Sequence, residues 1–137
     1  MTLIDLLAEP IARFILIPMM TCFIETLITY CSMNDNGRRF TWELCKWGTS
    51  LITTNFLLII TDIGTKAQYK QVDKEYLSNV IIALFVSTLI AIFSSLLVRS
   101  NAHVQSYSGQ MDMPVFLIHF SNVLGTLCLM TSYFIIY

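Results

Sequence analysis

The sequence predicts an all-α integral membrane protein with four transmembrane helices and a short N-terminal helix at the membrane interface. Of its 137 residues, 55% are hydrophobic and only 12% are charged, whereas about a quarter of the residues in a soluble domain are charged. The apolar residues fall into stretches of about 20, which cross roughly 30 Å of hydrocarbon at 1.5 Å per residue. We therefore expect one membrane-embedded domain over residues 1–137, with the lipid bilayer as its surroundings.

The first expected element is a short amphipathic helix that ends before Pro10. This segment mixes apolar and acidic residues: Leu3, Ile4, Asp5, Leu6, Leu7 and Glu9. A helix with one apolar and one charged side lies in the interface rather than across the bilayer. Four apolar stretches follow, at about 11–31, 47–65, 79–98 and 115–136, and each predicts a spanning helix.

The connections between the spans are expected to be polar loops, except for the one after the second span. Residues 66–78 contain neither Gly nor Pro, and Lys66, Lys70 and Lys74 recur at a spacing of four. This spacing places the three lysines on one face of a helix, so the second span is predicted to continue as a helix outside the membrane. The lysines are candidate contacts for a soluble partner or for lipid headgroups.

Four spans place both termini and the 66–78 connection on one side of the membrane. The basic residues divide equally: Arg13, Lys66, Lys70 and Lys74 on that side, and Arg38, Arg39, Lys46 and Arg99 on the other. The positive-inside rule therefore does not fix the orientation. We expect cytoplasmic termini in a bacterial inner membrane because lysines suit anionic headgroups or a cytosolic partner, and insertion in both orientations is the alternative.

Small residues on the third and fourth spans predict helix-packing faces. Helices in lipid approach each other where small side chains recur every four residues. The candidates are Ala83, Ser87, Ala91 and Ser95 in the third span and Gly125 in the fourth. These faces also suit self-association, so a homo-oligomer is expected.

Five polar residues within the spans are candidate intramembrane sites: Glu25, Asn55, Asp62, His119 and Asn122. Asp62 lies near the end of its span, and Lys66 is one helical turn away, which predicts an interfacial ion pair. Glu25 is deeper, where a charged carboxylate costs about 3 kcal/mol. Two interpretations of Glu25 stay open. Its carboxyl group either hydrogen-bonds to His119 or a threonine and locks the helices, or it binds an ion or a proton.

The remaining sequence features point away from several classes of protein. A net charge of −1 does not favour nucleic acid as a direct partner. No metal-binding spacing, phosphate-binding glycine loop or nucleophile–base pair is present, so we expect no metal, no cofactor and no enzymatic activity. Cys31 and Cys45 flank the same connection, and a disulfide between them is possible in an oxidising compartment.

Two functions fit these features. The first is an oligomeric membrane subunit that anchors or senses for a larger assembly, such as a bacterial stress or phage-defence system, and docks a soluble partner through the 66–78 connection. The alternative is an ion channel or an ion- or proton-coupled small transporter that uses Glu25.

Overall fold

The computed structural model describes residues 2–32, 46–108 and 115–137. Within these ranges it contains helices and no strand. The helices are α1 (Leu3–Ala8), α2 (Pro10–Ser32), α3 (Gly48–Gln68), α4 (Lys74–Ser108) and α5 (Val115–Ile136). The predicted all-helical class is therefore confirmed.

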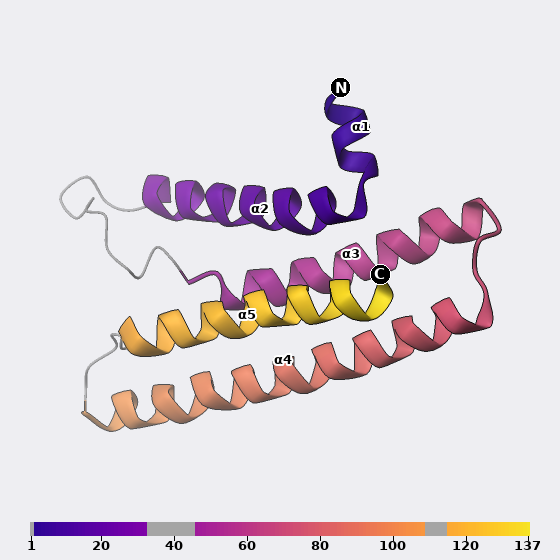
Figure 1. The fold of residues 1–137 in the computed structure, drawn as a ribbon. Coiled ribbons are helices and arrows are strands. Elements are labelled where there is room, and N and C mark those ends of the chain that lie inside the picture. Colours follow the sequence, from indigo (N-terminus) through magenta and orange to yellow (C-terminus); the bar gives the residue numbers. More distant parts are fainter. Residues whose placement is uncertain (1, 33–45, 109–114) are drawn as a thin grey trace.

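Helix α1 is short and turns away from the direction of α2 (Figure 1). The Thr2 hydroxyl accepts a hydrogen bond from the Asp5 amide, and the Asp5 carboxylate accepts one from the Thr2 amide. This reciprocal pair is a capping box, which satisfies amides that have no partner within the first turn. Helix α2 then begins with Pro10, a residue that suits the first helical position because its missing N–H would be unpaired there.

Three helices are long and apolar enough to cross a membrane: Pro10–Ser32, Lys74–Leu97 and Phe116–Ile136. They correspond to the first, third and fourth spans predicted from the sequence. Helix α3 has 21 residues but is more polar, and its polar residues Thr54, Asn55 and Asp62 are buried. It is thus a polar helix that turns much of its polar surface toward its neighbours.

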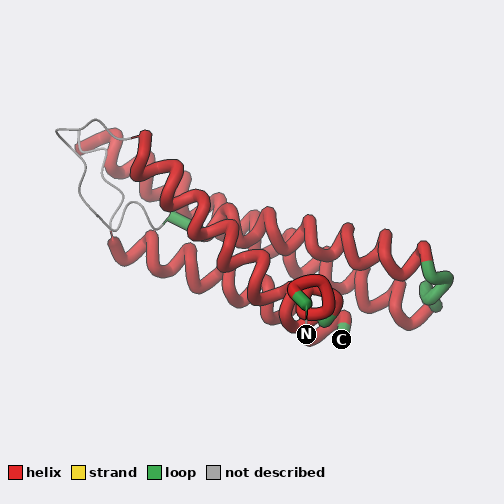
Figure 2. The backbone as a smooth tube through the Cα atoms, turned by 90° about the horizontal axis from the view of Figure 1, so that it is seen from above, coloured by secondary structure: helices red, strands yellow, loops and turns green. Residues whose placement is uncertain are grey.

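The four long helices run alternately up and down (Figure 1). Helix α5 packs along both α3 and α4, and α2 packs on α3 and touches α5. The view from above in Figure 2 shows the same elongated bundle, with both termini at the end where α2 begins and α5 ends. In the described part of the chain, α2 has only Phe14 and Pro18 buried, so it is the peripheral helix.

The expected helical extension through the three lysines is wrong. Helix α3 ends at Gln68, and Lys70 adopts a left-handed conformation with φ of 54°. The Gln71 and Lys70 amides donate to the carbonyls of Lys66 and Ala67 at 2.9 and 3.1 Å, which is the hydrogen-bond pattern of a Schellman motif. This motif reverses the chain, so the three lysines do not share one helix face.

The next helix starts soon after this turn and ends later than expected. The Asp73 carboxylate accepts a hydrogen bond from the Tyr76 amide at 2.7 Å and caps the beginning of α4. At the other end, a loop was expected from Arg99, but α4 continues to Ser108. The sequence from 99 to 108 contains no Gly or Pro, so nothing in its backbone chemistry ends the helix there.

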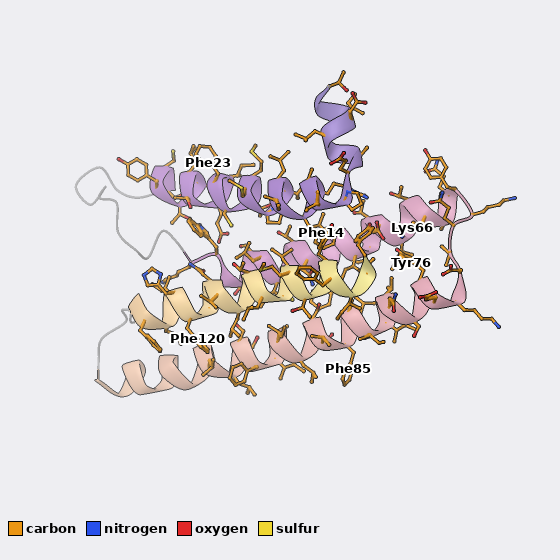
Figure 3. All side chains as sticks on the ribbon, viewed as in Figure 1. Phe14, Phe23, Lys66, Tyr76, Phe85 and Phe120 are labelled. Atoms are coloured by element: carbon orange, nitrogen blue, oxygen red, sulfur yellow. The ribbon has the colours of Figure 1, made fainter. Side chains whose placement is uncertain are left out.

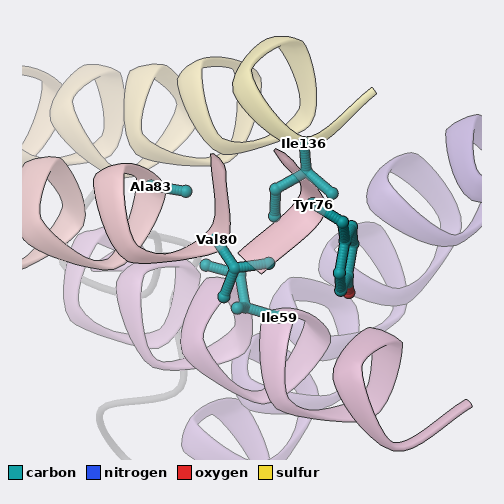
Figure 4. Packing of buried hydrophobic residues seen from close by; sticks show 5 residues of the cluster. All are labelled: Ile59, Tyr76, Val80, Ala83 and Ile136. Carbon is teal, nitrogen blue, oxygen red and sulfur yellow. The ribbon is translucent and has the colours of Figure 1, made fainter. Parts of the chain in front are cut away.

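The apolar core lies where α3, α4 and α5 meet. One buried cluster, drawn in Figure 4, comprises Ile59, Tyr76, Val80, Ala83 and Ile136. A second, nearer α2, comprises Phe14, Leu51, Leu58 and Leu129. Large apolar side chains also cover the outside of the bundle, as Figure 3 shows for Phe23 and Phe85, which are 63% and 65% exposed. Such a surface suits contact with lipid.

The predicted packing residues are buried in part. Ala83 and Ser87 are 0% and 1% exposed, whereas Ala91 is partly buried and Ser95 is exposed. Ser94 is buried where Ser95 was expected, because a helix advances 100° per residue and a strict spacing of four drifts across its face. Ala91 and Ser95 instead border a shallow groove beside Phe56 of α3.

Helices α3 and α5 approach each other closely at Gly125. A Cβ atom at Gly125 would lie 2.7 Å from the Leu51 Cβ and 2.9 Å from the Gly48 carbonyl oxygen. A Cβ atom at Gly48 would in turn collide with Ser121. The predicted packing role of Gly125 therefore has a direct steric basis, and it needs a second glycine on the partner helix.

Candidate intramembrane polar sites

Asp62 is the centre of a buried polar cluster that joins all four long helices. Its side chain is 2% exposed, and the Arg13 guanidinium of α2 lies 3.5 Å from Oδ1. The Tyr76 hydroxyl of α4 donates to Oδ2 at 2.5 Å, and the Tyr137 hydroxyl donates to Oδ1. A buried carboxylate is tolerated when such donors replace water, so this cluster satisfies Asp62 fully.

Lys66 belongs to this cluster but is not the ion-pair partner expected for Asp62. Its ammonium group lies 4.1 Å from the centre of the Tyr76 ring and 5.0 Å from that of Tyr137. Both distances allow a cation–π interaction, and Figure 3 shows Lys66 and Tyr76 at the same end of the bundle. Arg13 takes the place of the expected partner because α2 brings it beside α3.

Asn55 forms a second buried polar centre nearer the middle of the bundle. Its amide group donates to the Ser87 hydroxyl at 2.8 Å and to the Cys128 sulfur at 3.3 Å. The Ser87 and Ser132 hydroxyls lie 3.1 Å apart. These contacts cross-link α3, α4 and α5, so Asn55 acts as an interhelical tie rather than as part of an open path.

Trp47 connects the opposite end of the bundle. Its indole N–H donates to the Thr26 hydroxyl of α2 at 2.8 Å, and its backbone amide donates to the Asn122 side chain of α5 at 3.0 Å. Asn122 thus has a structural partner. His119 is exposed near the start of α5, and the Oε2 atom of Glu25 accepts no hydrogen bond from it.

Glu25 borders a pocket between α2 and α3, which we call the Glu25 pocket. Its volume is about 330 Å³, and it is lined by Thr21, Ile24, Glu25, Ile28, Thr29 and Ser50. The Glu25 Oε2 atom is buried and accepts no hydrogen bond, and among the described residues no cation pairs with the carboxylate. The Thr29 hydroxyl donates to the Glu25 backbone carbonyl rather than to the carboxylate.

A second hollow adjoins this pocket and extends toward Arg13. We call it the Arg13 groove. Its volume is about 360 Å³, and Thr21 and Ser50 border both hollows. Ile17 and Leu58 also line the Arg13 groove. Glu25 and Arg13 thus border two neighbouring hollows between α2 and α3, and Asp62, which lines neither hollow, pairs with Arg13.

The candidate residues therefore separate into different roles. Asn55, Asp62 and Asn122 are hydrogen-bonded within the bundle, although the buried Oδ1 atom of Asn55 accepts no hydrogen bond. Among the described residues, Glu25 combines an unsatisfied buried oxygen with a position beside a pocket. No group of three metal-ligating side chains occurs in the described ranges, and the proposed partner Cys45 of Cys31 lies outside them. Arg13, Tyr76 and Tyr137 were not identified from the sequence as partners of Asp62, because they are 49, 14 and 75 residues away from it.

Comparisons of the chain with protein-family models, with curated proteins and with solved structures each gave no match. The function is therefore inferred from the two hollows and the polar clusters.

Proposed function

We propose that the protein binds a proton or a small inorganic cation at Glu25 within the membrane, as part of an ion- or proton-coupled transporter or channel. The observation that carries this proposal is that the buried Oε2 atom of Glu25 has neither a hydrogen-bond donor nor a counter-ion in the described structure, on a side chain that borders a pocket. An isolated carboxylate in an apolar environment either takes up a proton or attracts a cation.

The surroundings of Glu25 support reversible binding more than a static lock. A locking carboxyl group would be hydrogen-bonded to a neighbouring helix, as Asp62 is to Tyr76. Glu25 instead lies on the peripheral helix, and Thr21, Thr29 and Ser50 border the same pocket. Hard cations prefer oxygen ligands, and a carboxylate can also accept a proton.

Flux through proteoliposomes tests this function. We expect the wild-type protein to dissipate an imposed proton, Na⁺ or K⁺ gradient, and Glu25→Gln to abolish that flux because the amide neither ionises nor replaces the carboxylate charge. Glu9→Gln is the matched control, since Glu9 is exposed and lies outside the long helices. Equal flux in Glu25→Gln and wild type would exclude the proposal.

An assembly subunit that docks a soluble partner is the second candidate function. Its support is that Lys70 and Lys74 are exposed at the end of the bundle that also carries both termini. The three lysines do not form the single basic stripe expected from the sequence, because Lys66 covers the tyrosine rings and Asp73 and Glu75 flank Lys74 in the sequence. Lys70→Ala with Lys74→Ala should abolish capture of a soluble partner but leave flux unchanged.

The proposed membrane arrangement has α3 as a fourth span and α1 in the interface. The alternating direction of the four long helices supports it, because helices satisfy their own backbone hydrogen bonds and can cross the hydrocarbon one after another. We place the termini in the cytoplasm of a bacterial cell and expect homo-oligomers. Reporter fusions at the C-terminus test the orientation: signal on both sides would indicate dual insertion, and a periplasmic signal alone would contradict the proposed orientation.

A further inference from the structure

We infer that the Arg13 groove is a binding site for an anionic phospholipid, with the headgroup phosphate at Arg13 and one acyl chain between α2 and α3. This inference does not depend on Glu25 or on ion transport. It rests on the surface chemistry of the groove, on its length, and on the charge at the end where Arg13 lies.

Many of the residues that line the groove are polar, but the atoms that they expose to it are mostly apolar. Five threonines line it, and four of them donate their hydroxyl hydrogen to a carbonyl one turn earlier in their own helix: Thr21, Thr53, Thr54 and Thr61. Because these hydroxyl hydrogens are already used, the groove offers few donors, and threonine methyl groups lie among the side chains of Ile17, Leu57 and Leu58. Such a surface suits a hydrocarbon chain better than water molecules, which need hydrogen-bond partners.

The groove faces the outside of the bundle, where lipid would surround it. Thr53 and Leu57 on its α3 side are exposed, and α2 buries only two residues along its length. The groove extends from residue 13 to 21 on α2 and from 49 to 61 on α3. At 1.5 Å per residue these segments are about 12 and 18 Å long, which is close to half of the roughly 30 Å hydrocarbon thickness. One leaflet's acyl chain therefore matches the groove in length.

The charge at one end of the groove selects the headgroup. Arg13 and Lys66 contribute two positive charges there, and Asp62 contributes one negative charge, so the cluster has a net positive charge. The Tyr76 and Tyr137 hydroxyls also hydrogen-bond to Asp62, so Arg13 is not its only donor. A guanidinium has five N–H donors, and the Asp62 contact uses one of its nitrogens. Basic pockets between transmembrane helices bind phosphate headgroups in this way.

Native mass spectrometry of the full-length protein tests the inference. The delipidated protein in detergent is mixed with equal amounts of phosphatidylglycerol and phosphatidylcholine, and retained lipid is counted. We expect phosphatidylglycerol to be retained about fivefold more than phosphatidylcholine. One net basic charge attracts an anionic headgroup by about 1 kcal/mol, which corresponds to this ratio. Arg13→Gln should remove this preference, whereas Lys74→Gln, an exposed basic residue at the same end of the bundle, should keep it.

A second pair of variants tests the acyl-chain groove without changing any charge. Thr53→Phe places a ring in the groove and should reduce total lipid retention about fivefold, a loss similar to that expected for the headgroup contact. Ile60→Phe adds the same ring to an exposed position of α3 outside the groove and should leave retention unchanged. These variants keep the inference testable even if Arg13→Gln does not fold.

Three results would overturn the inference. Equal retention of the two lipids by the wild type would remove the headgroup site. Displacement of phosphatidylglycerol by excess inorganic phosphate would assign Arg13 to a free anion instead. A change from dimer to monomer in Thr53→Phe, with lipid retention unaltered, would assign the groove to a second copy of this chain.

Discussion

The Arg13 guanidinium lies 3.5 Å from the Asp62 carboxylate, and this ion pair ties the peripheral helix α2 to α3. The pair is not isolated, because two tyrosine hydroxyls donate to the same carboxylate and the Lys66 ammonium covers both tyrosine rings. Five side chains from four elements thus form one connected cluster at the end of the bundle. Removal of its central acceptor would leave a guanidinium and two hydroxyls without a partner.

We therefore expect Asp62→Ala to destabilise the bundle by about 3–5 kcal/mol, the range for removing one member of a buried ion pair. The loss is measured by thermal or detergent-induced unfolding followed by circular dichroism. Glu75→Gln is the control, since this acid is exposed in the first turn of α4. A change below about 1 kcal/mol, the range of a surface ion pair, would show that the Asp62 cluster contributes little to stability.

Substitution by alanine should have opposite effects at Gly125, which lies at the α3–α5 crossing, and at Gly64, which does not. Gly125→Ala should destabilise the protein by about 1–3 kcal/mol, because the new Cβ meets the Gly48 backbone, which cannot move aside. Gly64→Ala should stabilise it by about 0.5–1 kcal/mol, because nothing lies within 4 Å of the added atom and alanine favours a helix. The same unfolding assay distinguishes them, and a stabilising Gly125→Ala would contradict the close approach.

The turn after α3 predicts that Lys70→Gly increases stability. Lys70 has a φ of 54°, a conformation that costs a residue with a Cβ atom about 1–2 kcal/mol and costs glycine almost nothing. We expect a gain of about 1 kcal/mol, reduced by the entropy that glycine adds to the unfolded chain. The neighbouring Gln71→Gly lacks the left-handed backbone and should give no such gain. A destabilising Lys70→Gly would mean that the Schellman turn does not form.

The sequence predicted helices well and contacts between them poorly. The span predicted at 115–136 coincides with α5, because Pro114 precedes a long, mostly apolar stretch. The turn at Lys70 was missed because lysine carries no signal for a left-handed backbone. Arg13 was not recognised as the partner of Asp62 because Lys66, one turn away in sequence, offered the same charge, and only the packing of α2 on α3 decides between them. The Glu25 pocket also depends on this packing, so the sequence identified the acid but not its unsatisfied oxygen.

Chemical modification of Glu25 provides a test that does not require flux. Dicyclohexylcarbodiimide, an apolar reagent, reacts with protonated carboxyl groups that it reaches from lipid. Glu25 borders an open pocket on the peripheral helix and has no donor for its buried Oε2 atom, so we expect the reagent to reach and modify it. Asp62 should resist, because its side chain is 2% exposed and is already contacted by Arg13 and two tyrosine hydroxyls. Peptide mass spectrometry locates the adduct. A bound cation should slow the reaction because it occupies the Glu25 carboxylate, and modification of Asp62 in preference to Glu25 would reverse the assignment of the two acids.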